Sequence, residues 1–221
     1  MTMRQPTILL TGFGPFPGAP INLSGALAEE IATVLARRSR TRRFVSAVLP
    51  TEWEVAPRQL ARLYRELSPV LSVHFGVSEK ATGLVVETMA RNVCAATPDA
   101  NDCLPRESCI DRNGAPCLEV SLPTRRIVSR LEACAVPARL SADAGNYICN
   151  ALLYRSLQLA ENAKAPAMAG FIHIPSAISG APVAYRSASK PALTWDQAIA
   201  GGLEAVCTAI AALPRRPPHQ R

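Results

Sequence analysis

Lysine, histidine and aromatic residues are scarce in this chain of 221 residues, as are charged residues and long apolar runs. The composition argues against a disordered, membrane-spanning or exported protein. Aromatic side chains make up 5% of the residues and charged side chains 19%, below the roughly 25% charge of an average globular chain. Apolar residues reach 48%, which supplies a buried core and argues against disorder. No apolar run approaches the ~20 residues of a membrane span, and residues 1–10 lead into patterned sequence without the outline of a signal peptide. The sequence therefore predicts a globular, cytoplasmic protein with no membrane partner.

The net charge of +7 does not indicate a nucleic-acid partner. Arginine accounts for 21 of the 24 basic residues, and this bias runs along the whole chain. The one dense basic run, at 37–43, follows an apolar helical stretch, where cations complement the carbonyl end of the helix dipole. No aromatic residues alternate with the run to stack against bases. We therefore expect a solvated helix end and no bound nucleic acid.

Seven cysteines are an odd number, and we expect neither a disulfide framework nor a metal site. Four of them, Cys94, Cys103, Cys109 and Cys117, are separated by eight, five and seven residues. That spacing lacks the C-x₂₋₄-C pairs of structural zinc sites, and only three histidines are present to assist. A role as small buried fillers and a redox role both stay open for these four cysteines.

Short apolar strands alternate with amphipathic helices along the chain. Unbroken apolar strands of this kind are typical of a mostly parallel sheet that helices cover on both faces. With neither an internal repeat nor a linker, the sequence predicts a single α/β domain over residues 1–213 and a flexible basic tail at 214–221. The predicted strands are 7–10, 44–49, 70–75, 84–93, 139–141 and 168–174. The predicted helices are 24–38, 53–67, 124–134, 145–163 and a last one that Thr194 caps, with irregular stretches at 94–118 and 176–193.

The three histidines make the search for a general base short. His219 lies in the predicted tail, and His74 lies within a continuous apolar strand, where a hydrogen-bonded core histidine is the ordinary role. His173 lies near the carboxyl end of the strand at 168–174, the edge at which open α/β sheets bind ligands. His173 is therefore the candidate base.

Cys149 and Glu87 are the residues that could work with such a base. Cys149 lies at the start of a predicted helix, where the helix dipole and unpaired N–H groups favour a thiolate and could hold an oxyanion. Glu87 is a charge within an otherwise apolar strand, which is costly unless it is paired. A carboxylate that orients an imidazole beside a thiol would complete a catalytic triad. From the residues alone, a buried structural cysteine remains the alternative.

Four blocks of sequence follow one another in an order that is typical of one enzyme family. The first is TGFGPF at 11–16 with NLS at 22–24, which is similar to T-G-F-x-P-F-x-G…N-P-S. The second, ETMARN at 87–92, is similar to E-x-x-A-x-N. The third and fourth, SADAGNYICN at 141–150 and FIHIP at 171–175, are similar to a nucleophile signature and a histidine block. Together they resemble the pyroglutamyl peptidase I (pyrrolidone-carboxylate peptidase) family.

The resemblance implies a cysteine peptidase that hydrolyses the amide bond after an N-terminal pyroglutamate residue of peptides. By the family's pattern, Cys149 is the nucleophile, His173 the base and then the acid, and Glu87 the group that orients His173. The family fold is an α/β/α sandwich, assembled as a homotetramer or dimer, and it needs no metal or other cofactor. Two alternatives stay open, a related thiol amidase with a different small acyl substrate and a non-catalytic binding homologue.

The resemblance also implies where the lactam ring of pyroglutamate binds. Phe13 and Phe16 would clamp the ring, Ile148 would lie beside it, and the main chain at Gly76 and Val77 would hydrogen-bond the lactam amide. A neutral ring needs apolar faces and a few polar contacts, and such residues supply both.

Two departures from the family pattern bear on activity. Leu23 replaces the usual proline of the first block. Many members carry an R-I-P-D-N run whose arginine is associated with the oxyanion site, whereas AATPDAN at 95–101 keeps the Pro-Asp pair without the arginine. Loss of a charged donor could cost several kcal/mol of transition-state stabilisation. We hypothesise that Arg91, on the same predicted strand as Glu87, compensates.

Overall fold

The structure is a computed structural model that describes residues 5–17, 19–182 and 193–214, with five helices and ten strands in these ranges. The helices are α1 (Leu23–Arg38), α2 (Val55–Leu67), α3 (Thr124–Ala133), α4 (Ile148–Glu161) and α5 (Trp195–Ala212). The strands are β1 (Thr7–Phe13), β2 (Arg43–Leu49), β3 (Leu71–Ser78), β4 (Leu84–Glu87), β5 (Met89–Arg91), β6 (Cys117–Glu119), β7 (Ala138–Ser141), β8 (Met168–Pro175), β9 (Ile178–Ser179) and β10 (Leu193–Thr194).

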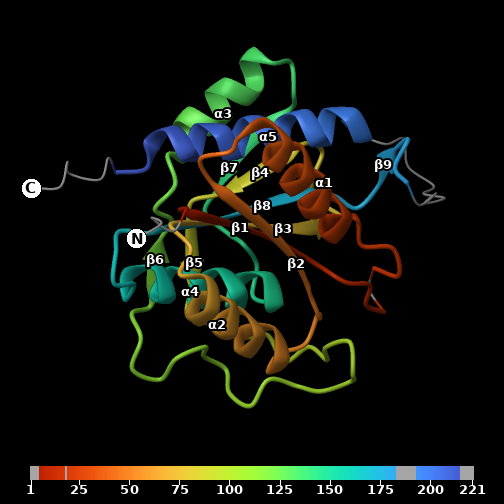
Figure 1. Cartoon of the computed structure of the whole chain (residues 1–221). Helices are drawn as coiled ribbons and strands as arrows, with labels where there is room; N and C mark the ends of the chain where they lie inside the picture. Colours follow the sequence, from red (N-terminus) through yellow and green to blue (C-terminus); the bar gives the residue numbers. More distant parts are fainter. Residues whose placement is uncertain (1–4, 18, 183–192, 215–221) are drawn as a thin grey trace, which may run out of the picture.

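These elements form three layers around one central sheet (Figure 1). The sheet has six strands in the order β2-β1-β3-β8-β4-β7. Helices α1, α3 and α5 lie over one face, and α2 and α4 lie over the other. All neighbouring strands are parallel except β4 and β8, which pair antiparallel. The predicted α/β/α sandwich with a mostly parallel sheet is confirmed.

Alternation along the strands divides the apolar residues into two cores. In β8, Ile172 and Ile174 pack toward α1 and α5, whereas Phe171 packs toward α2 and α4. Each fully buried side chain of this size contributes roughly 1.5–3 kcal/mol to folding. Because residues two apart share a face of a strand, His173 lies on the same face as Phe171.

Several predicted boundaries differ from the structure because they depend on pairing between distant segments. The stretch predicted as one strand at 84–93 is two strands, since Thr88 separates β4 in the central sheet from β5, which pairs with β6. The prediction of an irregular stretch over 94–118 is wrong at its end, where β6 begins. The predicted loop at 176–193 contains β9 and the first residue of β10. Of the predicted tail, all but Pro214 lies outside the described residues.

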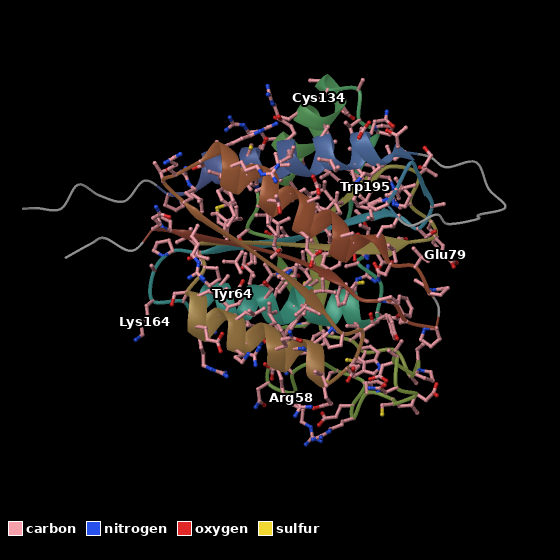
Figure 2. The ribbon with its side chains drawn as sticks, turned by 45° about the vertical axis from the view of Figure 1, so that its right-hand side comes forward. Arg58, Tyr64, Glu79, Cys134, Lys164 and Trp195 are labelled. Carbon is pink, nitrogen blue, oxygen red and sulfur yellow. The ribbon has the colours of Figure 1, made fainter. Side chains whose placement is uncertain are left out.

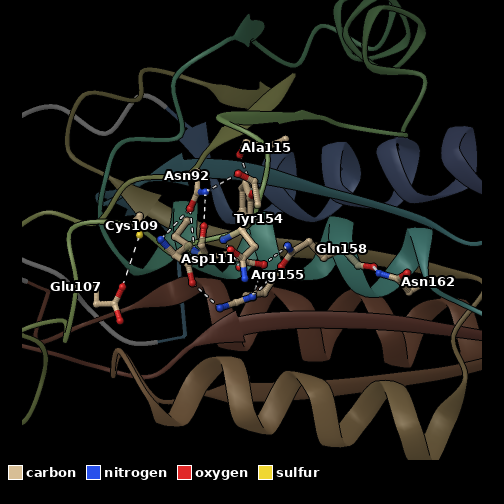
Figure 3. A network of polar contacts seen from close by, with 12 residues as sticks. Asn92, Glu107, Cys109, Asp111, Ala115, Tyr154, Arg155, Gln158 and Asn162 are labelled. Carbon is tan, nitrogen blue, oxygen red and sulfur yellow. Dashed lines mark hydrogen bonds and ion pairs between the residues drawn. The ribbon is translucent and has the colours of Figure 1, made fainter.

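The segment 92–116 is folded around the side chain of Asn92 (Figure 3). Its amide donates to the carbonyl oxygens of Asp111 at 2.7 Å and Gly114 at 3.2 Å. Its Oδ1 accepts the backbone N–H groups of Ile110 and Asp111, both at 2.9 Å. One half-buried side chain therefore holds the two ends of this segment together.

The same segment is fastened to α4 by side chains along that helix (Figure 3). The hydroxyl of Tyr154 donates to the carbonyl of Ala115 at 2.7 Å. Gln158 and Arg155 donate to Oδ2 of Asp111 at 2.7 and 3.3 Å. These contacts bind the segment to the helix that carries Cys149.

Replacement of Asn92 by alanine removes four hydrogen bonds and leaves half-buried backbone groups without partners. We expect the free energy of unfolding, measured by urea denaturation, to fall by about 2 to 3 kcal/mol. Asn113→Ala, which removes an exposed amide in the same segment, is the matched control and should change it by less than about 0.5 kcal/mol. Equal losses in the two variants would contradict the role assigned to Asn92.

A chain of buried hydrogen bonds runs through His74. Its Nδ1 lies 2.7 Å from Oγ1 of Thr11, and its Nε2 lies 2.7 Å from Oγ of Ser156. Ser156 continues the chain to the hydroxyl of Tyr64 at 2.9 Å. Burial lowers the pKa of His74 to about 3. His74 is therefore a neutral core histidine with both ring nitrogens bonded, as its place in an apolar strand indicates.

The buried neutral state of His74 predicts a loss of stability in acid. Its pKa falls from 6.5 to about 3 on folding, so between these values the unfolded chain binds a proton that the folded chain does not. The free energy of unfolding should therefore fall below about pH 6.5, by up to about 1.4 kcal/mol per pH unit from this residue. Urea denaturation at pH 6.5 and pH 5 should show a shallower fall for His74→Gln than for the wild type. An unchanged slope would refute this assignment.

Candidate functional site

A cavity of about 530 Å³ opens at the end of the central sheet at which β1, β3 and β8 finish. Cys149, His173 and Glu87 all line it. Glu79, another lining residue, lies at this end of the sheet in Figure 2, and Lys164 lies at the opposite end. The structure thus brings together the three residues from separate elements that the sequence predicts as a triad.

Cys149 is the second residue of α4, and its thiol lies against Gly76 of β3. A Cβ atom added to Gly76 would lie 3.0 Å from the Sγ of Cys149 and 2.7 Å from a ring carbon of Phe171, so the residue at 76 has no room for a side chain. Tyr147, the N-cap residue, is extended, and among the described residues its side chain makes no cap hydrogen bond. The helix therefore presents the thiol in its first turn, where N–H groups have no partner within the helix.

The imidazole of His173 forms a buried contact with the carboxylate of Glu87. Nδ1 of His173 lies 2.8 Å from Oε1 of Glu87, and the two residues are 8% and 1% exposed. Burial alone would lower the pKa of His173, but hydrogen bonds to Cys149 and Glu87 and the negative charges of both outweigh it and raise the pKa to about 9. At neutral pH the site therefore holds an imidazolium, with Nδ1 turned toward Glu87.

The register of the sheet explains why these side chains meet. Gly76 in β3 is opposite His173 in β8, and His173 is opposite Val85 in β4. Val85 is in turn opposite Arg139 in β7. Residues paired across neighbouring strands share a face of the sheet. Glu87, two residues beyond Val85, lies on that face too and reaches His173 diagonally.

The residues predicted to hold the lactam ring are placed in two groups. Phe13, Phe16 and Val77 line the cavity. Gly76 and Ile148 are not among the described residues that line it. Gly76 packs beneath the thiol of Cys149, and Ile148 lies in the core, where it is 1% exposed. The predicted ring contact of Ile148 is therefore not supported by its position.

Tyr147 is a cavity residue that the sequence analysis did not single out. Its ring centroid lies 6.0 Å from that of Phe16 and 5.2 Å from that of Trp53. Its hydroxyl donates to the carbonyl of Pro98 at 2.9 Å. Its place two residues before Cys149, at the N-cap of α4, was the available signal.

The hypothesis that Arg91 compensates for the missing arginine finds no support in the geometry. Its guanidinium pairs with Asp143 at 3.7 Å, and it is absent from the cavity lining described by the structure. Lys80 and Arg139 are the lysine and arginine residues found in that lining. Neither was predicted, because only the strand register brings Arg139 near the site.

The other cysteines form no site in the described part of the chain. All seven are free, and no group of three or more histidine, cysteine or acidic residues could hold a metal ion within the described ranges. Burial, followed by the charge of nearby Cys109, raises the pKa of Cys94 to about 11, which leaves Cys94 an uncharged thiol.

None of the described helices has the length and apolar character to cross a membrane.

Comparison with known proteins agrees with this geometry. A sequence model of the pyroglutamyl peptidase family matches residues 6–213. The pyrrolidone-carboxylate peptidase of Cupriavidus pinatubonensis is similar, with 31% identity over 207 residues and coverage of 93% of each chain. That of Alkaliphilus oremlandii is 33% identical over 169 residues, which cover 76% of this chain and 78% of the relative. The crystal structure of pyroglutamyl peptidase I from Bacillus amyloliquefaciens has a TM-score of 0.80 at 27% identity and covers 94% of this chain and 98% of its own. The chain belongs to the pyroglutamyl peptidase family.

Proposed function

We propose that this protein is a cysteine peptidase that removes an N-terminal pyroglutamate residue from peptides, with Cys149, His173 and Glu87 as its triad. The observation that carries the proposal is the 2.8 Å contact between His173 and Glu87 in the cavity that also holds the thiol of Cys149. Family membership supports the same activity, and the family match over residues 6–213 supports one peptidase domain over 1–213.

The reaction follows from the charges at the site. The thiolate of Cys149 attacks the carbonyl carbon that follows the lactam ring, and the oxyanion that forms faces the N–H groups in the first turn of α4. The imidazolium of His173 gives its proton to the leaving amine, and the C–N bond breaks to leave a thioester. Neutral His173 then takes a proton from water, whose oxygen attacks the thioester. Release of free pyroglutamate restores the thiolate and the imidazolium.

The substrate contacts follow from the cavity lining. Phe13 and Phe16 supply apolar surface for the lactam ring, and the main chain at Val77 supplies polar contacts. A site of this kind recognises a small neutral ring and needs no cofactor. We propose a homo-oligomer, a dimer or tetramer, as the family resemblance implies. A cytoplasmic location suits seven free thiols, one of which must stay reduced to act.

Replacement of Cys149 by alanine should abolish release of a fluorophore from a pyroglutamyl arylamide under reducing conditions, by at least about a thousandfold in kcat. Cys207→Ala, which removes an exposed thiol from α5 on the opposite face of the sheet, is the matched control and should retain activity. Full activity in Cys149→Ala would reject this nucleophile. A folded wild type that cleaves other aminoacyl amides but not the pyroglutamyl one would instead identify a related amidase.

Replacement of Glu87 by glutamine should move the alkaline limb of the pH profile of kcat/KM to lower pH. The limb reports loss of the imidazolium proton of His173, whose pKa is about 9 with the Glu87 carboxylate in place. Without that negative charge the pKa of His173 falls, and we expect a shift of about one pH unit or more. Glu79→Gln removes another carboxylate from the cavity lining and should leave the limb in place. Identical limbs in wild type and Glu87→Gln would exclude Glu87 as the partner of the acid.

A further inference from the structure

The cavity has an acyl side and a leaving side, if the proposed function holds. Phe13 on β1 and Val77 on β3, which would hold the lactam ring, lie on one side of β8 in the sheet order β2-β1-β3-β8-β4-β7. His173, which would protonate the leaving amine, lies on β8 itself. The peptide that leaves must therefore extend to the other side, over β4 and β7.

Arg139 is the cation that lies on this leaving side. It is in register with Val85, which is in register with His173, so its side chain shares the face of the sheet on which the site is built. Neighbouring strands lie about 4.8 Å apart, which puts the backbone of Arg139 about 10 Å from that of His173. Its side chain lines the cavity and thus spans part of that gap.

No described carboxylate pairs with Arg139. Among the described residues its guanidinium donates one hydrogen bond, at 3.5 Å, to the carbonyl of the next residue, Leu140. The side chain is exposed, so its charge faces the solvent of the cavity. An arginine guanidinium presents a planar fork of donors that matches a carboxylate. A neutral lactam ring carries no negative charge with which this guanidinium could pair.

The carboxylates that line the cavity have partners or neighbours other than Arg139. Glu87 is paired with His173, and Asp143 is paired with Arg91 at 3.7 Å. Glu79 and Lys80 are adjacent in the chain, in the turn after β3, and their opposite charges offset each other at long range. The remaining charge on the leaving side is the positive charge of Arg139.

We propose that Arg139 is a specificity-determining residue that binds a carboxylate on the leaving part of the substrate. An extended chain advances about 3.5 Å per residue, so a carboxylate on the first residue after the scissile bond lies between β8 and β7, within the gap that Arg139 spans. The carboxylate is either the C-terminal group of a pyroglutamyl dipeptide or the side chain of an aspartate or glutamate. The preferred substrates are therefore short or acidic pyroglutamyl peptides.

The test compares kcat/KM for substrates that differ in one charge. Pyroglutamyl-alanine against pyroglutamyl-alaninamide tests a C-terminal carboxylate. Pyroglutamyl-aspartate against pyroglutamyl-asparagine, both amidated at the C-terminus only, tests a side-chain carboxylate. We expect the wild type to prefer the carboxylate about fivefold in at least one pair, and added salt to reduce the preference. The preference should vanish in Arg139→Ala and survive in part in Arg139→Lys. Arg126→Ala, which removes an exposed arginine from α3 on the far face, should keep it.

Each outcome separates the inference from the function on which it rests. Cleavage of the amidated substrates without any preference for a carboxylate would overturn the role of Arg139 and leave the peptidase activity standing. A preference of equal size in wild type and Arg139→Ala would also overturn it. Failure of the folded wild type to cleave any pyroglutamyl amide would overturn both. The melting temperature of each variant shows whether it is folded.

Discussion

The approach of α4 to the central sheet at Gly76 is the constraint on which the site depends. The space that a side chain would occupy there is taken by the sulfur of Cys149 and the ring of Phe171. The ring of Phe171 in turn packs against the imidazole of His173, with centroids 4.7 Å apart. A larger residue at 76 would therefore displace both the thiol of Cys149 and the ring that packs against His173, because close-packed interiors transmit such shifts.

The reversed direction of β4 explains why Glu87, the acidic member of the proposed triad, is buried. Open α/β sheets place functional side chains at the carboxyl ends of parallel strands, where they face solvent. Because β4 runs against β8, its last residue, Glu87, lies beside the interior of β8 and is 1% exposed. Low exposure strengthens the interaction between the carboxylate and the imidazolium, since little water screens it. Burial by itself lowers the pKa of His173, but interactions with Cys149 and Glu87 raise it to about 9, and the topology of the sheet supplies the Glu87 part of that increase.

The sequence was sufficient for the features that depend on local pattern. The alternation of strands and helices predicted the layered α/β fold, and residue chemistry together with four short blocks predicted Cys149, His173 and Glu87. What it did not predict depends on pairing between distant segments. The break of 84–93 at Thr88 and the strand at 117–119 depend on each other, because β5 forms by pairing with β6. Neither can be predicted from its own residues. Arg139 reaches the site only through a register that runs across three strands, and Ile148, adjacent to Cys149, turns into the core.

The central position of β8 has a consequence for how the chain becomes active during synthesis. β8 lies between β3 and β4 but begins only at residue 168 of 221. A nascent chain without it can form β2-β1-β3 and β4-β7 only as separate ribbons, each with an open edge available to other chains. Such late, long-range closure slows folding and exposes intermediates to aggregation. Because His173 lies on this same strand, it meets Glu87 only at the step that joins the two halves of the sheet, so the proposed triad is completed late in folding.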